Sequence, residues 1–148
     1  MKIYERNLNS SVRKVDEDHI LVETSLLDLN HSMRVELLIH TKTNVIENAV
    51  SETTKVPLKA CDVPQGHIKK IIGLKIERGI NRQLIQILGG CDGCTHLYEL
   101  ALTSVRLTFN VLMGLRYDWE QWVSRSLSDE EFTKQATPHL KGSCYPFK

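Results

Sequence analysis

The sequence predicts an α+β domain in which an antiparallel sheet comes first and helices then pack on one of its faces. Residues 1–55 are rich in β-branched and other apolar residues with strand-like alternation, and residues 61–115 carry apolar residues at helical spacing. Residues 117–148 form a shorter helical tail, and no low-complexity linker separates these segments. A chain of 148 residues fits one domain. We therefore expect a single domain over 1–148, whose second sheet face is partly solvated or meets a partner.

Four strand segments are expected in the first part of the chain. They lie within Ile3–Val15 and over Ile20–Leu29, Met33–His40 and Val45–Thr54. Met33–His40 alternates between apolar and polar residues over most of its length, as a half-buried strand does. The short links between the segments favour an antiparallel meander. The alternation of the last segment predicts that Val45, Glu47 and Ala49 share one face, with Ile46, Asn48 and Val50 on the other.

Three helices are expected next. The first covers about residues 62–73 and is capped by Asp62, and the second covers Ile80–Leu88 with Asn81 as a possible cap. The third is the longest and covers about residues 95–115. Its expected core face follows 3,4 spacing and contains Leu97, Leu100, Ala101, Val105, Thr108, Phe109 and Leu112.

The tail that follows the long helix holds both tryptophans and one capping signal. Trp119 and Trp122 are spaced as residues that pack a helix, with an exposed interface as the alternative. Ser128 stands three residues before Glu131, which is the spacing of a capping box at the start of a short final helix. Pro138 is expected to end that helix.

The composition argues against several classes of protein. The net charge is +1, no basic block stands out and only 6% of the residues are aromatic, so we expect no nucleic-acid partner. No apolar run reaches the length of a transmembrane helix, and the first residues lack the apolar core of a signal peptide. We expect a cytoplasmic protein without a membrane partner. In that reducing compartment the four cysteines serve more readily as thiols or metal ligands than as disulfides.

The side chains with the most chemistry lie between Gly89 and Leu100. Cys91, Cys94 and His96 fall in this stretch, among glycines that let the backbone turn sharply before the long helix. Two thiols and an imidazole on such a turn can converge on a soft metal ion, or the two thiols can form a redox disulfide. The residue types leave both chemistries open.

Two further cysteines and a carboxylate extend the metal hypothesis. Cys61 precedes a predicted helix, and Cys144 lies near the end of the chain, from where it could fold back as a ligand. Glu99 follows His96 by three residues on the same helical face, where it could hold the second ring nitrogen. Zinc suits mixed Cys/His ligands and an iron–sulfur cluster suits cysteine-rich ones. Each cysteine also has the simpler alternative of a buried core residue.

The most distinctive run in the chain is Gly93-Cys94-Thr95-His96-Leu97-Tyr98-Glu99-Leu100, with Pro57 and Cys61 upstream and Cys144 downstream. In these residues the chain resembles a bacterial family catalogued as domain of unknown function number 2889. The resemblance covers most of residues 5–145. It implies that Cys61, Cys94, His96 and Cys144 belong to the family's pattern, while Cys91 is peculiar to this chain. It implies no particular activity.

The order of the elements is also similar, more remotely, to that of the U-type iron–sulfur cluster scaffold proteins. Cys61 would match the scaffold's helix-start cysteine, and Cys94 with His96 would match its His-Cys pair, in reversed order and one residue apart. The loop of the scaffold's first cysteine would hold Asp28 or His31 here. This resemblance implies a scaffold-like fold that binds zinc or a nascent iron–sulfur cluster.

Three functions follow as alternatives. The first is a metal-binding module whose ligands are Cys61, Cys94 and His96, with Cys91 or Cys144 as the fourth, and it predicts that the Cys61 and Cys94 sulfurs meet. The second is a thiol-based enzyme, because a helix N-terminus favours the thiolate of Cys94 and His96 could act as its base. The third is an interaction domain without chemistry, which forms a homo-oligomer or binds another protein.

Overall fold

In the computed structural model, which describes residues 1–116 and 119–148, the chain divides into two compact units. The first unit covers Met1–Val111 and contains the sheet together with the helices that follow it in sequence. The second covers Leu112–Lys148. The described part confirms the α+β class, with strands first and helices after. The side chains of Trp119 and Trp122, on which the interface prediction rests, lie outside the described residues.

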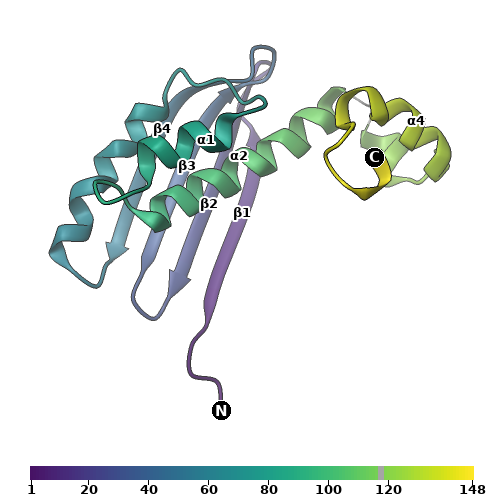
Figure 1. Ribbon diagram of the computed structural model, residues 1–148. Coiled ribbons are helices and arrows are strands. Elements are labelled where there is room, and N and C mark those ends of the chain that lie inside the picture. Colours follow the sequence, from purple (N-terminus) through teal and green to yellow (C-terminus); the bar gives the residue numbers. More distant parts are fainter. Residues whose placement is uncertain (117–118) are drawn as a thin grey trace. The chain divides into compact units, whose positions relative to one another are not determined.

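The sheet is an antiparallel meander of four strands in the order β1-β2-β3-β4. The strands are β1 (Arg6–Lys14), β2 (His19–Asp28), β3 (Ser32–His40) and β4 (Val45–Lys55). Figure 1 draws them as arrows and labels each one. Each predicted strand is therefore present. Their links are a few residues long, so consecutive strands pair as neighbours and the chain returns to the same end of the sheet with every second strand.

One face of the sheet carries the core, and Figure 1 shows helices α1 and α2 lying across the sheet on one side. The inward side chains alternate strictly along β2 and β3: Ile20, Val22, Thr24 and Leu26, then Met33, Val35, Leu37 and Ile39. In β4 the predicted alternation is wrong, because Ile46 and Ala49 are both buried. Leu38 of β3 pairs with Asn48 and the next residue, Ile39, pairs with Ile46, so β4 has one extra residue and forms a bulge at this point. An extra residue in a strand reverses the sheet face toward which the following side chains point.

The segment between the sheet and the long helix contains two helices of different types. The first, η1 (Lys59–Ile71), is a 3₁₀ helix preceded by Leu58, so the cap predicted at Asp62 is wrong. The second, α1 (Ile80–Leu88), has the predicted bounds but begins after Gly79, whose φ of 99° only glycine adopts readily, so the cap predicted at Asn81 is also wrong.

The long helix α2 (Thr95–Arg116) begins at the predicted residue and runs one residue past the predicted end. Its buried face contains Leu97, Leu100, Ala101 and Val105 as expected. Phe109 is 40% exposed, which contradicts its predicted place in the core. The buried face of α2 contains Ser104 instead, one turn before the fully buried Thr108. Phe109 follows Thr108 directly, and successive residues of a helix are separated by about 100° around its axis. None of the described helices combines the length and hydropathy needed to cross a bilayer.

The second unit contains α3 (Trp119–Val123), α4 (Asp129–Leu140) and the 3₁₀ turn η2 (Tyr145–Phe147). The predicted capping box is confirmed, since the Ser128 hydroxyl accepts from the Glu131 amide and the Glu131 carboxylate accepts from the Ser128 amide. The prediction that Pro138 ends the helix is wrong, because α4 continues through it to Leu140. Proline's φ suits a helix, and in the last turn it removes only one backbone hydrogen bond.

Candidate functional site

The site begins with an ion pair between the first two strands. Arg6 opens β1 and is the register partner of Asp28, which closes β2, so both side chains project from the same face at one end of the sheet. The Arg6 Nε and Nη2 atoms lie 2.9 and 2.8 Å from Oδ2 of Asp28. Both bonds therefore go to a single carboxylate oxygen, and the other oxygen is left for the turn that follows β2.

Asp28 uses that second oxygen, Oδ1, to organise the turn. The backbone amides of Asn30 and His31 each donate to it at 2.8 Å, and the Nδ1 atom of His31 lies 3.0 Å away. Burial by itself would raise the pKa of Asp28, but the hydrogen bonds from Asn30, His31, Tyr4 and Arg6 together outweigh it and hold the pKa well below its usual range. Asp28 is therefore an ionised acceptor, so Nδ1 of His31 carries a proton, and in the neutral imidazole the lone pair is then on Nε2.

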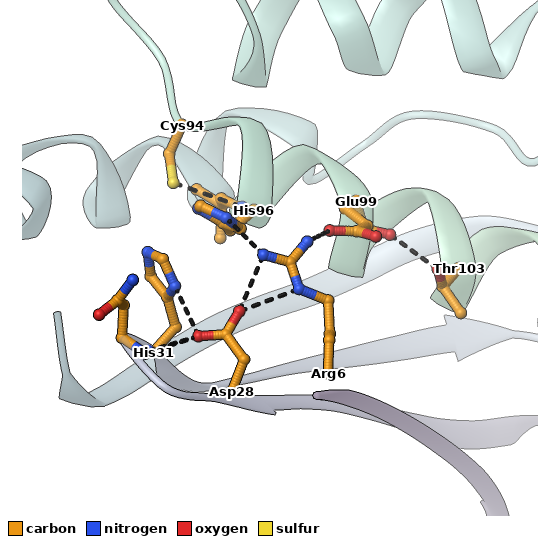
Figure 2. A network of polar contacts seen from close by, with 9 residues as sticks. Arg6, Asp28, His31, Cys94, His96, Glu99 and Thr103 are labelled. Atoms are coloured by element: carbon orange, nitrogen blue, oxygen red, sulfur yellow. Dashed lines mark hydrogen bonds and ion pairs between the residues drawn. The ribbon is translucent and has the colours of Figure 1, made fainter. Parts of the chain in front are cut away.

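The first turns of α2 supply the other wall of the site. Figure 2 shows Arg6 between Asp28 on the sheet and His96 and Glu99 on the helix. Its Nη1 donates to Glu99 at 3.1 Å, and its Nη2 lies 3.2 Å from Nε2 of His96. Because a guanidinium only donates, Nε2 of His96 accepts this bond. From the sequence, Glu99 was expected to hold the ring of His96. In the structure Glu99 contacts Arg6, and Arg6 contacts His96.

The two imidazoles of the site stack on each other. The ring centroids of His31 and His96 are 3.9 Å apart with an interplanar angle of 38°. Burial lowers the pKa of His96, and the neighbouring His31 and Arg6 lower it further. His96 is therefore neutral at pH 7, and the cluster combines one guanidinium, two carboxylates and two imidazoles drawn from three separate segments of the chain.

Cys94 stands immediately before α2. Its carbonyl accepts the amide of Tyr98 at 3.0 Å, as the residue before a helix does, and its Sγ accepts the amide of Leu97 at 3.5 Å. The sulfur therefore lies at the N-terminal end of α2, in contact with a backbone amide of its first turn. The chain reaches this position through a tight turn in which the Cys94 amide donates to the carbonyl of Leu88.

The remaining predicted ligands are distributed over both units. Cys61 is half-buried in η1, Cys91 is exposed in the turn before α2, and Cys144 is exposed in the second unit. Within the described residues, the group of three or more metal-ligating side chains whose ligand atoms all lie within 4.8 Å of one another is His19, His40 and Glu47. It includes none of the predicted ligands, and the Cys/His metal site and the meeting of Cys61 with Cys94 stay predictions.

The sequence assigned no role to Arg6, and it named Asp28 and His31 only as occupants of the loop that would correspond to the scaffold's first cysteine. His31 and Asp28 share a turn, and their spacing of three residues was the available signal, since an aspartate commonly binds the backbone and side chains of the turn it opens. Arg6 had no signal of its own, because its role depends on strand pairing that places it opposite Asp28.

The comparisons with known proteins identify a family and nothing closer. No curated protein and no solved structure matches the chain, so the resemblance to the U-type scaffold proteins stays a prediction. A family model described as "Protein of unknown function (DUF2889)" matches residues 9–110. This range contains β2 through most of α2, including His31, Cys94 and His96, and leaves out Arg6 and Cys144. Because the match spans more than half of the 148 residues, the chain belongs to the DUF2889 family of proteins of unknown function.

Proposed function

We propose that this protein is a thiol-dependent enzyme in which Cys94 is the nucleophile of a group-transfer reaction. The observation that carries the proposal is the gathering of complementary groups around the first turn of α2. A thiol held at the helix N-terminus and a neutral imidazole come from the start of α2, and an imidazole oriented by a buried carboxylate comes from the turn after β2. A nucleophile near a base, and a base oriented by a third group, form the usual arrangement for covalent catalysis.

His31 is better suited than His96 to act as the base. Asp28 accepts from Nδ1 of His31 at 3.0 Å, so Nε2 of His31 has its lone pair available for a proton. The lone pair of His96 at Nε2 is already occupied by Arg6 at 3.2 Å. His96 then packs against the ring of His31 and limits its rotation. The base suggested by the sequence, His96, becomes a positioning residue in this proposal.

The proposed acyl transfer to Cys94 needs no cofactor. The Cys94 thiol gives its proton to Nε2 of His31, and the sulfur attacks the carbonyl carbon of an ester, thioester or amide. The C–X bond of that substrate breaks, the leaving group takes the proton from His31, and a thioester remains on Cys94. Water or another nucleophile then takes the acyl group. Catalytic hydrogen bonds commonly shorten only when substrate binds, so the thiol and Nε2 are expected to meet in the complex.

The reactivity of the four thiols tests the proposal. We expect chloroacetamide at pH 7 to alkylate half-buried Cys94 faster than exposed Cys91 and Cys144, because in this proposal His31 takes the proton of the Cys94 thiol. His31→Gln should slow alkylation of Cys94 by at least about tenfold, since it removes the proton acceptor. Peptide mass spectrometry at timed intervals gives the rate for each cysteine separately.

Two variants serve as controls for this experiment. His139→Gln removes an exposed histidine of the second unit and should leave the Cys94 rate unchanged. Cys91→Ser should also leave it unchanged, because group transfer needs no resolving thiol, whereas a redox disulfide would. Faster labelling of Cys91 and Cys144 than of Cys94, or an unchanged Cys94 rate in His31→Gln, would contradict the proposal.

A further inference from the structure

A second cluster lies at the opposite end of β2 from Asp28. His19 is the first residue of β2 and His40 the last residue of β3, and the two are register partners. Both side chains leave the face opposite the core, because their neighbours Ile20 and Ile39 are buried. Glu47 reaches them from β4, and its Oε2 lies 3.0 Å from Nε2 of His19. The ligand atoms of these three side chains all lie within 4.8 Å of one another.

We propose that His19, His40 and Glu47 bind a divalent transition-metal ion such as zinc on the face of the sheet opposite the core. Two histidines and one glutamate are a recurrent zinc set that leaves a fourth position for water or a substrate. Tetrahedral zinc with ligands at about 2.1 Å separates its ligand atoms by about 3.4 Å. The ligand atoms of the three side chains lie within 4.8 Å of one another, which is close to the separation that a zinc site requires.

The surroundings of His19 favour metal binding through Nε2. Its other nitrogen, Nδ1, lies 2.8 and 2.9 Å from the two carboxylate oxygens of Asp16. A carboxylate on the far nitrogen orients the ring and strengthens a histidine as a ligand. Three carboxylates, those of Asp16, Asp18 and Glu47, lie around these rings, and Lys42 pairs with Asp18, so the two carboxylates that contact His19 favour a cation there.

The backbone beneath the cluster is braced from both sides. The amide and the hydroxyl of Thr41 donate to the carbonyl of Asp18 at 2.7 and 3.1 Å, and this ties the turn after β3 to the turn before β2. His40 is engaged as well, since its Nδ1 accepts the amides of Lys42 and Thr43 at 3.2 and 3.4 Å. Ligation through Nε2 places the proton on Nδ1 and breaks these two contacts, so binding has a local spectroscopic signature.

Zinc titration of the full chain tests the proposal. We expect one zinc ion per chain by equilibrium dialysis, with affinity lowered at least about 100-fold by His19→Ala or His40→Ala. Glu47→Gln keeps the size of the side chain and should weaken binding at least about tenfold, and Asp16→Asn, which touches only the outer nitrogen, about tenfold or more. The amide resonances of Lys42 and Thr43 should shift on zinc addition, while circular dichroism confirms that each variant is folded.

Controls separate this site from the cysteines. His139→Gln and Cys94→Ser should retain full zinc affinity, because neither residue belongs to the cluster. Loss of zinc in Cys94→Ser with none in His19→Ala would overturn the proposal in favour of a thiolate site. An absence of zinc binding by the wild-type chain at micromolar concentrations, or unchanged Lys42 and Thr43 resonances at saturation, would also overturn it.

Discussion

Asp28 accepts hydrogen bonds at both oxygens of its carboxylate. It is buried, and its two oxygens receive bonds from Arg6, from His31 and from two backbone amides. Those bonds stabilise the ionised form in the folded chain only, which is why its pKa lies well below its usual range. The carboxylate therefore links the pH of the solution to the stability of the fold.

The sign of this linkage follows from the lowered pKa. In the unfolded chain Asp28 titrates near its ordinary value of about 4, so its contribution is fully present above that pH and is lost as the pH falls toward the folded-state pKa. Asp28→Asn should lower the free energy of unfolding by about 2 kcal/mol at pH 7. It should also flatten the fall in stability below pH 4, measured by urea denaturation at several pH values.

Exposed Asp62 provides the matched comparison, since Asp62→Asn should change neither quantity by a measurable amount. If the wild-type and Asp28→Asn stability curves stay parallel below pH 4, the network does not hold Asp28 in the way described. At this scale the sequence named Cys94 and His96 as candidate site residues from their residue types and their place at the start of a helix. It missed Arg6, because nothing local distinguishes an arginine that pairs across strands from a solvated one.

At the scale of single elements, the turn into α2 depends on Gly93. A Cβ built at Gly93 would lie 2.2 Å from the carbonyl oxygen of Leu88 and 2.4 Å from that of Gly89, distances that no side chain tolerates. Gly93→Ala must therefore displace backbone, which we expect to cost about 1–3 kcal/mol of stability. It should also shift the amide resonances of Cys94 and Leu97, which mark the start of α2.

Gly66→Ala is the matched control, since nothing lies within 4 Å of a Cβ built there. Equal destabilisation by the two substitutions would show that the turn accommodates a side chain at residue 93. Glycines before the long helix were evident from the sequence as a turn signal. Which of them is sterically required was not, because that depends on where the carbonyls at the end of α1 point.

At the scale of the whole molecule, α2 connects the site to the core of the first unit. The Ser104 hydroxyl lies 2.8 Å from the Thr24 hydroxyl of β2, and Thr24 lies 3.0 Å from the Ser10 hydroxyl of β1. Thr24 and Ser104 are buried, and the hydroxyls of the three residues satisfy one another. They lie within a contact that is otherwise apolar and that includes the fully buried Leu97 and Leu100.

Leu100→Ala should therefore destabilise the protein by about 2–5 kcal/mol, because it leaves a cavity beneath the helix. Leu115→Ala makes the same chemical change on the same helix at a side chain that is 52% exposed. It should cost no more than about 0.5 kcal/mol. Urea midpoints at constant slope give both values, and similar losses from the two substitutions would contradict the assignment of the core face.

The sequence alone determined the α+β class, the four strands, the bounds of α1 and the start of α2, since these depend on local periodicity and on glycine punctuation. Only the tertiary structure decided the bulge that turns both Ile46 and Ala49 inward. It also brought Arg6, Asp28 and His31 to His96 at the start of α2, and His19 to His40 and Glu47. Both clusters join side chains from different strands, and the register of strand pairing, which no local pattern records, sets their distances.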